Sequence, residues 1–247
     1  MTAIRLHDLT LGYERRPAVH HLDGVFEPSQ LHAIVGPNGS GKSTLLKGLA
    51  GALPPLSGRV ELAGLKPRDI AYLPQDSSVD RTFPMTLEDL VGLGLMRQRG
   101  LFGAVTAADR HRLEQAFAAV GLSGFERRGV DQVSGGQLQR ALFARVLVQD
   151  ARLILLDGPF TALDARTTSD LLDLIARWPS EGRTVVMVLH DLDLVRRTCT
   201  DALLLAREAV AWGPTNETLQ PENLLKARRL SEAWSDHAHI CHKGEAA

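Results

Sequence analysis

Gly36-Pro37-Asn38-Gly39-Ser40-Gly41-Lys42-Ser43-Thr44 follows the apolar run Leu31–Val35 and precedes a helix start at residues 45–50. The pattern G-x-x-x-x-G-K-[ST] lets the backbone curl so that successive N–H groups point at phosphate oxygens. Lys42 then supplies a positive charge to the outer phosphates, and the Ser43 hydroxyl can bind Mg²⁺. The helix that opens at Gly41 attracts the same anion through its dipole. Because a strand and a helix flank it, this stretch predicts a nucleoside triphosphate site rather than an ordinary glycine-rich turn.

Composition is that of a globular α/β protein. The chain has 247 residues, 44% of them hydrophobic, which suits one large domain or one domain with a subsidiary lobe. Its 28 basic and 29 acidic residues give a net charge of −1 with no long run of one sign, so we expect no nucleic-acid partner. Two cysteines, Cys199 and Cys241, are too few for a disulfide framework and indicate a reducing compartment. With neither a signal peptide nor a membrane-length apolar run, the chain is expected to be cytoplasmic and to act on membranes through a partner.

Two kinds of β-sheet are expected. Short β-type runs with turns occupy residues 3–35, and residues 59–62 and Ile70–Leu73 continue that pattern. These runs predict an antiparallel piece beside the phosphate loop. Residues 153–156 and 184–189 are continuous apolar runs, as expected for parallel strands buried on both faces.

A helical insertion separates these two parts. Leu113, Ala116, Phe117 and Val120 recur at helical spacing, and residues 83–128 are expected to be mostly helical. We therefore predict an α/β fold. It has a P-loop NTPase core with a mostly parallel sheet, an N-terminal antiparallel β subdomain, and an α-helical subdomain inserted at about residues 76–150. Further helices are expected near residues 138–148, 171–178 and 222–230, the last after two short strands.

Two further stretches suit phosphate chemistry. Asp157 ends an apolar strand, where it can hold Mg²⁺ opposite Ser43 or simply close the strand into a turn. Ser134-Gly135-Gly136-Gln137 opens a helix, where it can bind a second anion or serve as a plain cap. It can serve the same nucleotide only if a second copy of the protein brings it across an interface.

The order of these motifs resembles the nucleotide-binding subunit of an ABC transporter over about residues 3–225. By that resemblance, Tyr13 stacks on the adenine of ATP, a role that its aromatic face suits, although it could also be a half-buried strand tyrosine. Gln75 is implied to reach Mg²⁺ and the attacking water. Asp164 is implied to meet the opposing subunit, or else to cap a helix. His190 is implied to contact the γ-phosphate and water.

A narrower resemblance concerns the cargo. Leu73-Pro74-Gln75, residues 82–86 and residues 99–102 are similar to importers of zinc, manganese and chelated iron. That likeness implies an ATP-hydrolysing motor, most readily for zinc, or else for manganese. It implies a homodimer formed through ATP, integral-membrane permease subunits, and a periplasmic or extracellular metal-binding protein. The ATP-binding domain is expected to span residues 1–235 and to lie on the inner face of the cell membrane.

One position departs from the family pattern. The family has glutamate after the strand aspartate, as the main candidate general base, but this chain reads Asp157-Gly158-Pro159. Glycine offers no side chain, and loss of a general base typically costs about 10²- to 10⁴-fold in rate. Binding of ATP should survive while hydrolysis is impaired. The alternative function is therefore an ATP-gated assembly or regulatory factor that does not hydrolyse ATP.

The C-terminal tail, residues 236–247, concentrates imidazole and thiol groups. If it is helical, His237 and Cys241 share one face, and His239 and His242 share another. These are ligand types that zinc accepts. A solvated tail without metal is the alternative.

Overall fold

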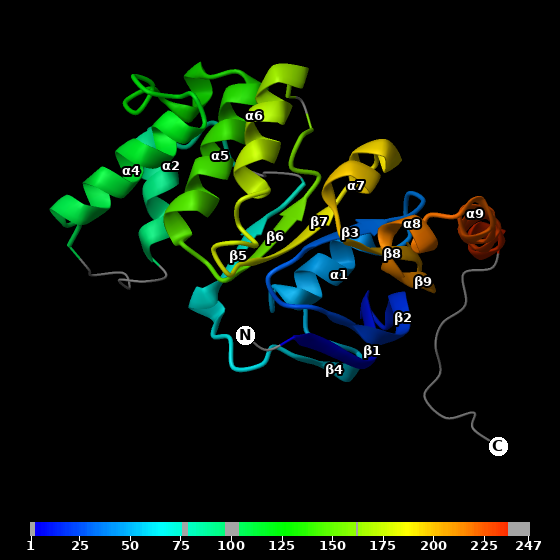
Figure 1. Cartoon of the computed structure of the whole chain (residues 1–247). Coiled ribbons are helices and arrows are strands. Elements are labelled where there is room, and N and C mark those ends of the chain that lie inside the picture. The colour runs from blue at the N-terminus through cyan, green and yellow to red at the C-terminus, as the bar shows by residue number, and fades with distance from the viewer. Residues whose placement is uncertain (1–2, 76–78, 97–103, 162, 237–247) are drawn as a thin grey trace.

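Two β-sheets form the framework of the protein. The computed structural model describes residues 3–75, 79–96, 104–161 and 163–236. The smaller sheet is antiparallel, in the order β2-β1-β4, from strands β1 (Ile4–Tyr13), β2 (Arg16–Phe26) and β4 (Ser57–Glu61). The larger sheet has the order β5-β6-β7-β3-β8-β9 and lies above the smaller one in Figure 1. Its strands are β3 (Leu31–Val35), β5 (Ile70–Leu73), β6 (Leu153–Asp157), β7 (Thr184–Val188), β8 (Asp201–Ala206) and β9 (Glu208–Pro214).

The expectation for Ile70–Leu73 was wrong. This run is β5, and it pairs in parallel with β6, from Ile70 opposite Leu153 to Leu73 opposite Leu156. Its continuous apolar character suits a strand of the larger sheet, where both faces are covered. The predicted parallel core is confirmed, since only β9 runs antiparallel to its neighbour, β8.

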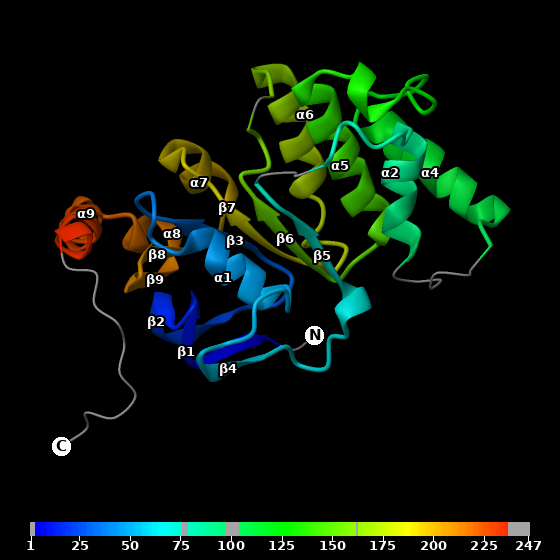
Figure 2. The same ribbon diagram turned by 180° about the vertical axis from the view of Figure 1, so that it is seen from behind.

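The larger sheet has a core on each face because successive side chains point to opposite sides. On β3, Ile34 packs on the same side as Leu45 and Leu46 of α1 (Lys42–Leu49), which lies between the two sheets. Ala33 and Val35 face the other side and pack with the helices there. Figure 2 shows α1 and these helices on opposite faces of the sheet. Full burial of a leucine or isoleucine side chain is worth about 1.5–3 kcal/mol, so these two cores fix the strand on which the phosphate loop begins.

The helical insertion lies between β5 and β6, as predicted. The predicted apolar stripe is buried, with Phe117 at 1% exposure. A capping box opens each main helix here, at Thr86, Thr106 and Ser134, and each cap typically contributes about 1 kcal/mol. The helices of this part are α2 (Leu87–Gly92), α4 (Ala107–Ala119) and α5 (Gly135–Gln149), with 3₁₀ turns η2 (Leu93–Leu95) and η3 (Val130–Gln132).

The remaining helices lie outside the insertion. Those expected near residues 171–178 and 222–230 are present, and both begin earlier in the chain than expected. No helix in the described part of the chain is both long and apolar enough to cross a membrane. These elements are η1 (Pro67–Asp69), α6 (Ala165–Ile175), α7 (Leu192–Thr198), α8 (Thr215–Thr218) and α9 (Pro221–Asp236). The candidate zinc ligands His237, His239, Cys241 and His242 lie outside the described residues, and their role stays a prediction.

His32 on β3 predicts a pH-dependent stability. Its ring is 1% exposed; Nε2 donates to the Glu27 carbonyl at 2.8 Å, and Nδ1 has no partner among the described residues. Burial lowers the pKa of His32 below its usual 6.5, although the Glu27 carbonyl and the Asp201 carboxylate oppose the shift. Between the lowered pKa and 6.5 the unfolded chain binds more protons than the folded one, so stability falls as pH falls through that window.

We therefore expect His32→Gln to flatten the dependence of the unfolding free energy on pH below 6.5. The change in slope approaches about 1.4 kcal/mol per pH unit at most, the value for one proton. Urea unfolding at a series of pH values measures it, with the exposed His111→Gln as the matched control. An unchanged slope in His32→Gln contradicts the expectation. Some slope remains in either case because burial also lowers the pKa of His20.

Candidate functional site

The candidate site lies where four parallel strands end. The phosphate loop follows β3, Gln75 follows β5, Asp157 ends β6, and His190 follows β7. The strands are in register, with Asp157 opposite Val188 on β7. Because carboxyl ends of parallel strands share one edge of the sheet, residues far apart in sequence meet there.

The phosphate loop lies between two backbone segments that leave no room for a side chain at two of its glycines. Gly36 and Gly41 have φ angles of 151° and 94°, in the region that favours glycine. A Cβ at Gly36 would clash with the Leu205 carbonyl, and one at Gly41 with the Ala18 carbonyl. On the same side, the Ser40 carbonyl accepts a hydrogen bond from the Arg207 N–H at 3.0 Å. The loop conformation is therefore set by β2 and by the β8–β9 turn as well as by its own glycines.

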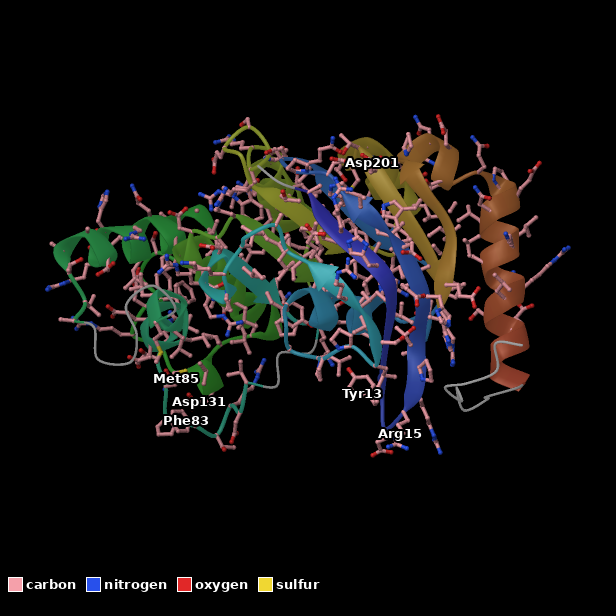
Figure 3. The ribbon with its side chains drawn as sticks, turned by 90° about the horizontal axis from the view of Figure 1, so that it is seen from below. Tyr13, Arg15, Phe83, Met85, Asp131 and Asp201 are labelled. Atoms are coloured by element: carbon pink, nitrogen blue, oxygen red, sulfur yellow. The ribbon has the colours of Figure 1, made fainter. Side chains whose placement is uncertain are left out.

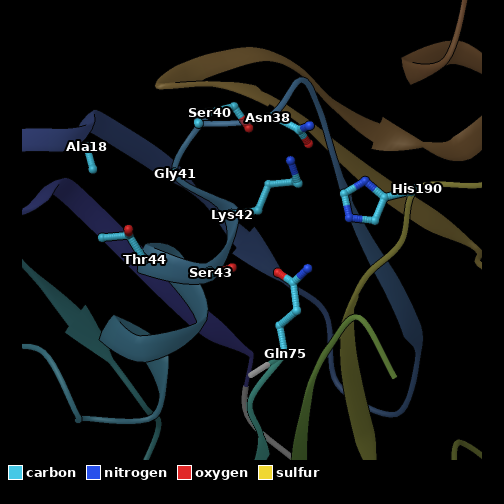
Figure 4. Close-up of a pocket in the computed structure, with 10 residues that line it drawn as sticks. Ala18, Asn38, Ser40, Gly41, Lys42, Ser43, Thr44, Gln75 and His190 are labelled. Atoms are coloured by element: carbon cyan, nitrogen blue, oxygen red, sulfur yellow. The ribbon is translucent and has the colours of Figure 1, made fainter. Parts of the chain in front are cut away.

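Most of the phosphate loop surrounds one cavity of about 640 Å³, at the start of α1 (Figure 4). This volume lies in the range that suits a small-molecule ligand, about 300–1,000 Å³. Gly36 and Pro37 instead line a smaller apolar cavity of about 210 Å³ behind the loop, together with Leu224 and Ala227 of α9. The larger cavity is lined by Ala18, Asn38, Gly39, Ser40, Gly41, Lys42, Ser43, Thr44, Gln75 and His190.

Lys42 is a buried cation at the centre of this cavity. Its Nζ donates to the carbonyls of Gly36 at 2.8 Å and Pro37 at 2.7 Å, and the residue is 7% exposed. Burial lowers the pKa of the ammonium group, and the Asp157 carboxylate opposes that shift. A desolvated positive charge aimed into a cavity attracts a polyanion strongly.

The residues beside Lys42 fit a magnesium ion. Asp157 is 1% exposed, it accepts a hydrogen bond from the Ser43 hydroxyl, and its Oδ1 has no partner among the described residues. Burial raises the pKa of Asp157, while the Ser43 hydrogen bond and the charge of Lys47 oppose the rise. A hydroxyl, a carboxylate and the nearby Gln75 amide are the hard oxygen donors that Mg²⁺ accepts. An orphaned, buried carboxylate oxygen is the polar group that such a cation would satisfy.

Gln75 and His190 reach the cavity from the ends of two different strands, β5 and β7. Figure 4 shows both side chains directed toward Lys42. His190 is exposed and lines both cavities, so its ring is open to a ligand. Both side chains therefore line the same cavity as the phosphate loop.

Gly158 has a backbone that is adapted to glycine. Its φ is 56°, in the left-handed region, and a Cβ there would lie 3.1 Å from Thr161 Oγ1 and 3.3 Å from Gln75 Cγ. The Gly158 carbonyl also accepts a hydrogen bond from Thr161 Oγ1 at 2.9 Å. The side chain of Gln75 thus packs beside the position where the family has glutamate.

Ser134, Asp164 and Tyr13 do not line the cavity. Ser134 Oγ accepts from the Gln137 N–H at 3.2 Å and caps α5, whose first turn holds Gly135, Gly136 and Gln137. Asp164 accepts from the Thr167 N–H at 2.8 Å and caps α6, and the hydrogen bonds from Thr167 lower the pKa of its carboxyl. The two capping alternatives are therefore confirmed as contacts within one chain. Both caps are exposed, so they remain accessible to a second copy.

Two residues that the sequence motifs did not predict lie near the site. Ala18 lines the cavity from β2, and Lys47 lies near both Tyr13 and Asp157. Spacing offered a signal for Lys47, because it lies four residues after Ser43 and so shares its helix face. Nothing local marked Ala18, which the pairing of β2 with β1 brings to the loop.

The sequence of this chain is similar to those of known transport proteins. The family model described as ABC transporter matches residues 19–161. A manganese transport system ATP-binding protein of Synechocystis sp. is 38% identical over 85% of this chain and 83% of its own length. A zinc transport system ATP-binding protein of Treponema pallidum is 37% identical over 91% of this chain and 86% of its own length.

A solved structure is similar over much of the chain. It is a dimeric ATP-binding cassette in a post-hydrolysis state with ADP and Pi, 26% identical, with a TM-score of 0.75 over 86% of this chain and 98% of that one. The phosphate loop, the aspartate at the end of β6 and the two-sheet fold agree with that likeness. This chain belongs to the ABC transporter family, as one of its ATP-binding domains.

Proposed function

We propose that this chain is the ATP-binding and ATP-hydrolysing motor of an importer for a divalent transition-metal ion. The observation that carries the proposal is the cavity in which Lys42, Gln75 and His190 converge on the phosphate loop. The names of the relatives, which are manganese and zinc transport system proteins, support the cargo class. The resemblance of the motifs favours zinc over manganese, and that preference stays a prediction.

In this proposal each residue has a distinct task. The N–H groups of the phosphate loop and Lys42 bind the phosphates of ATP, Ser43 and Asp157 hold Mg²⁺, and Gln75 and His190 orient water and the γ-phosphate. Mg²⁺ would neutralise charge on the phosphate oxygens, which favours attack by water. Tyr13 binds the base by stacking.

We further propose that two copies close around two ATP molecules, so that each phosphate loop faces the other copy's Ser134 and Asp164. The exposure of both capping residues and the dimeric state of the similar cassette support this arrangement. Membrane work then falls to separate permease subunits, with a metal-binding protein outside the membrane and this chain on the inner face. Phe83, labelled in Figure 3, is 58% exposed and offers apolar surface for such a contact.

Reconstitution tests the proposal. The full chain and its permease are placed in vesicles with the metal-binding protein, and uptake of Zn²⁺ and of Mn²⁺ is measured with and without Mg-ATP. We expect ATP-dependent uptake of one ion in preference to the other, and none with Lys42→Met. Equal uptake without ATP, or uptake of neither ion, contradicts a metal-import function.

A second candidate function rests on Gly158. Because the position usually held by glutamate carries no side chain and has a left-handed backbone, an ATP-gated factor that closes without turnover is the alternative. Stable ATP-dependent closure with no phosphate release, even with permease present, would favour it.

A further inference from the structure

Lys47 contacts the residue that is proposed to stack on adenine. It lies on α1, one turn after Ser43, and its Nζ is 3.3 Å from the Tyr13 hydroxyl oxygen. The same Nζ is 5.8 Å from the centre of the Tyr13 ring. Because the ammonium is much nearer the hydroxyl than the ring centre, it lies at the hydroxyl edge of the ring. Lys47 therefore does not cover the centre of either ring face.

Among the described residues, Lys47 is the one hydrogen-bond partner of the Tyr13 side chain. Tyr13 ends β1 at a two-residue turn in which Glu14 and Arg15 have φ angles of 49° and 62°, and it is 48% exposed. Figure 3 shows Tyr13 and Arg15 at the tip of this hairpin. An exposed tyrosine samples several rotamers, and fixing one rotamer on binding costs conformational entropy. A contact that already restrains the ring removes part of that cost.

Lys47 also connects this hairpin with the metal side of the site. Its charge opposes the rise that burial causes in the pKa of Asp157. Burial likewise raises the pKa of Tyr72, and the nearby Asp157 and Tyr13 add to that rise. Lys47 is thus close to both ends of the proposed ATP site.

We propose that Lys47 is a positioning residue for recognition of the base, holding the Tyr13 ring by its hydroxyl edge so that a purine can stack on its face. This inference rests on the proposed binding of ATP. It makes Lys47 matter for a nucleoside triphosphate and not for a phosphate chain that lacks a base.

The test compares Mg-ATP with Mg-tripolyphosphate, which has the phosphates alone. Calorimetry on the full chain should show Lys47→Met weakening ATP affinity by about two- to tenfold, the range for a single net hydrogen bond. The affinity for tripolyphosphate should stay unchanged, which also shows that the variant is folded. Lys226→Met, at an exposed position on α9, is the matched control.

A double-mutant cycle with Tyr13→Phe isolates the contact. Phenylalanine keeps the stacking face and loses the hydroxyl, so Lys47→Met should cost little further ATP affinity in that background. Equal losses for ATP and tripolyphosphate would overturn the inference and assign Lys47 to the Asp157 side. Unchanged affinity for both would also overturn it. An unmodified chain that binds tripolyphosphate but not ATP would instead contradict the proposed function.

Discussion

Replacing Gly158 with glutamate is expected to raise ATP turnover by about 10²- to 10⁴-fold, the usual contribution of a general base. ATP affinity should change little, because the phosphate loop, Lys42 and Asp157 are all present. Faster hydrolysis should also shorten the lifetime of the ATP-loaded dimer if reopening depends on phosphate release. Phosphate release under single-turnover conditions, and dimer lifetime by light scattering, measure the two effects.

Any side chain at position 158 is expected to lower the stability of the fold, and this loss must be separated from the effect on hydrolysis. A residue with a Cβ in the left-handed region costs about 1–2 kcal/mol, and the Cβ also crowds Thr161 Oγ1 and Gln75 Cγ. Gly158→Gln carries the same strain and nearly the same volume without a carboxylate, so it is the matched control. We expect both variants to lose similar stability in thermal unfolding, with only the glutamate raising turnover. Equal turnover in the original chain and in Gly158→Glu would show that another group, such as His190, activates the water.

Replacing Ser134 with arginine is expected to abolish ATP-dependent dimerisation. In the closed dimer each Ser134 would contact the partner's ATP, and loss of a hydrogen bond to a charged group costs about 1.5–3 kcal/mol, or about 10- to 100-fold in affinity per site. The free-energy cost is doubled because a dimer has two such sites. The bulky arginine also blocks the close approach of the two copies. Sizing or light scattering with Mg-ATP measures it.

The loss of the helix cap must be controlled, since Ser134 also stabilises α5. Thr106 opens α4 with the same capping-box geometry and is likewise exposed, so Thr106→Arg removes an equivalent cap away from the proposed interface. We expect Thr106→Arg to dimerise normally. If the original chain stays monomeric at high concentration with Mg-ATP and permease, the two-copy arrangement is wrong.

The sequence by itself determined the features whose causes are local. The phosphate loop was predictable because the glycines, Lys42 and Ser43 are contiguous, and their conformations follow from backbone freedom and helix position. The helix α4 and the cap at Ser134 were predictable for the same reason, since their partners lie three or four residues away. The missing side chain at Gly158 is likewise a fact of the sequence.

Tertiary structure alone decided the features that depend on distant partners. β5 joins the parallel sheet rather than the antiparallel one because it pairs with β6, a choice that its own apolar residues could not specify. The left-handed Gly158 lies next to Thr161 and to Gln75, which is distant in the sequence. The contact between Lys47 and Tyr13 depends on the packing of β1 against α1. Such contacts form between segments that are separated by loops, so packing over the whole chain decides them. No local sequence pattern predicts these contacts.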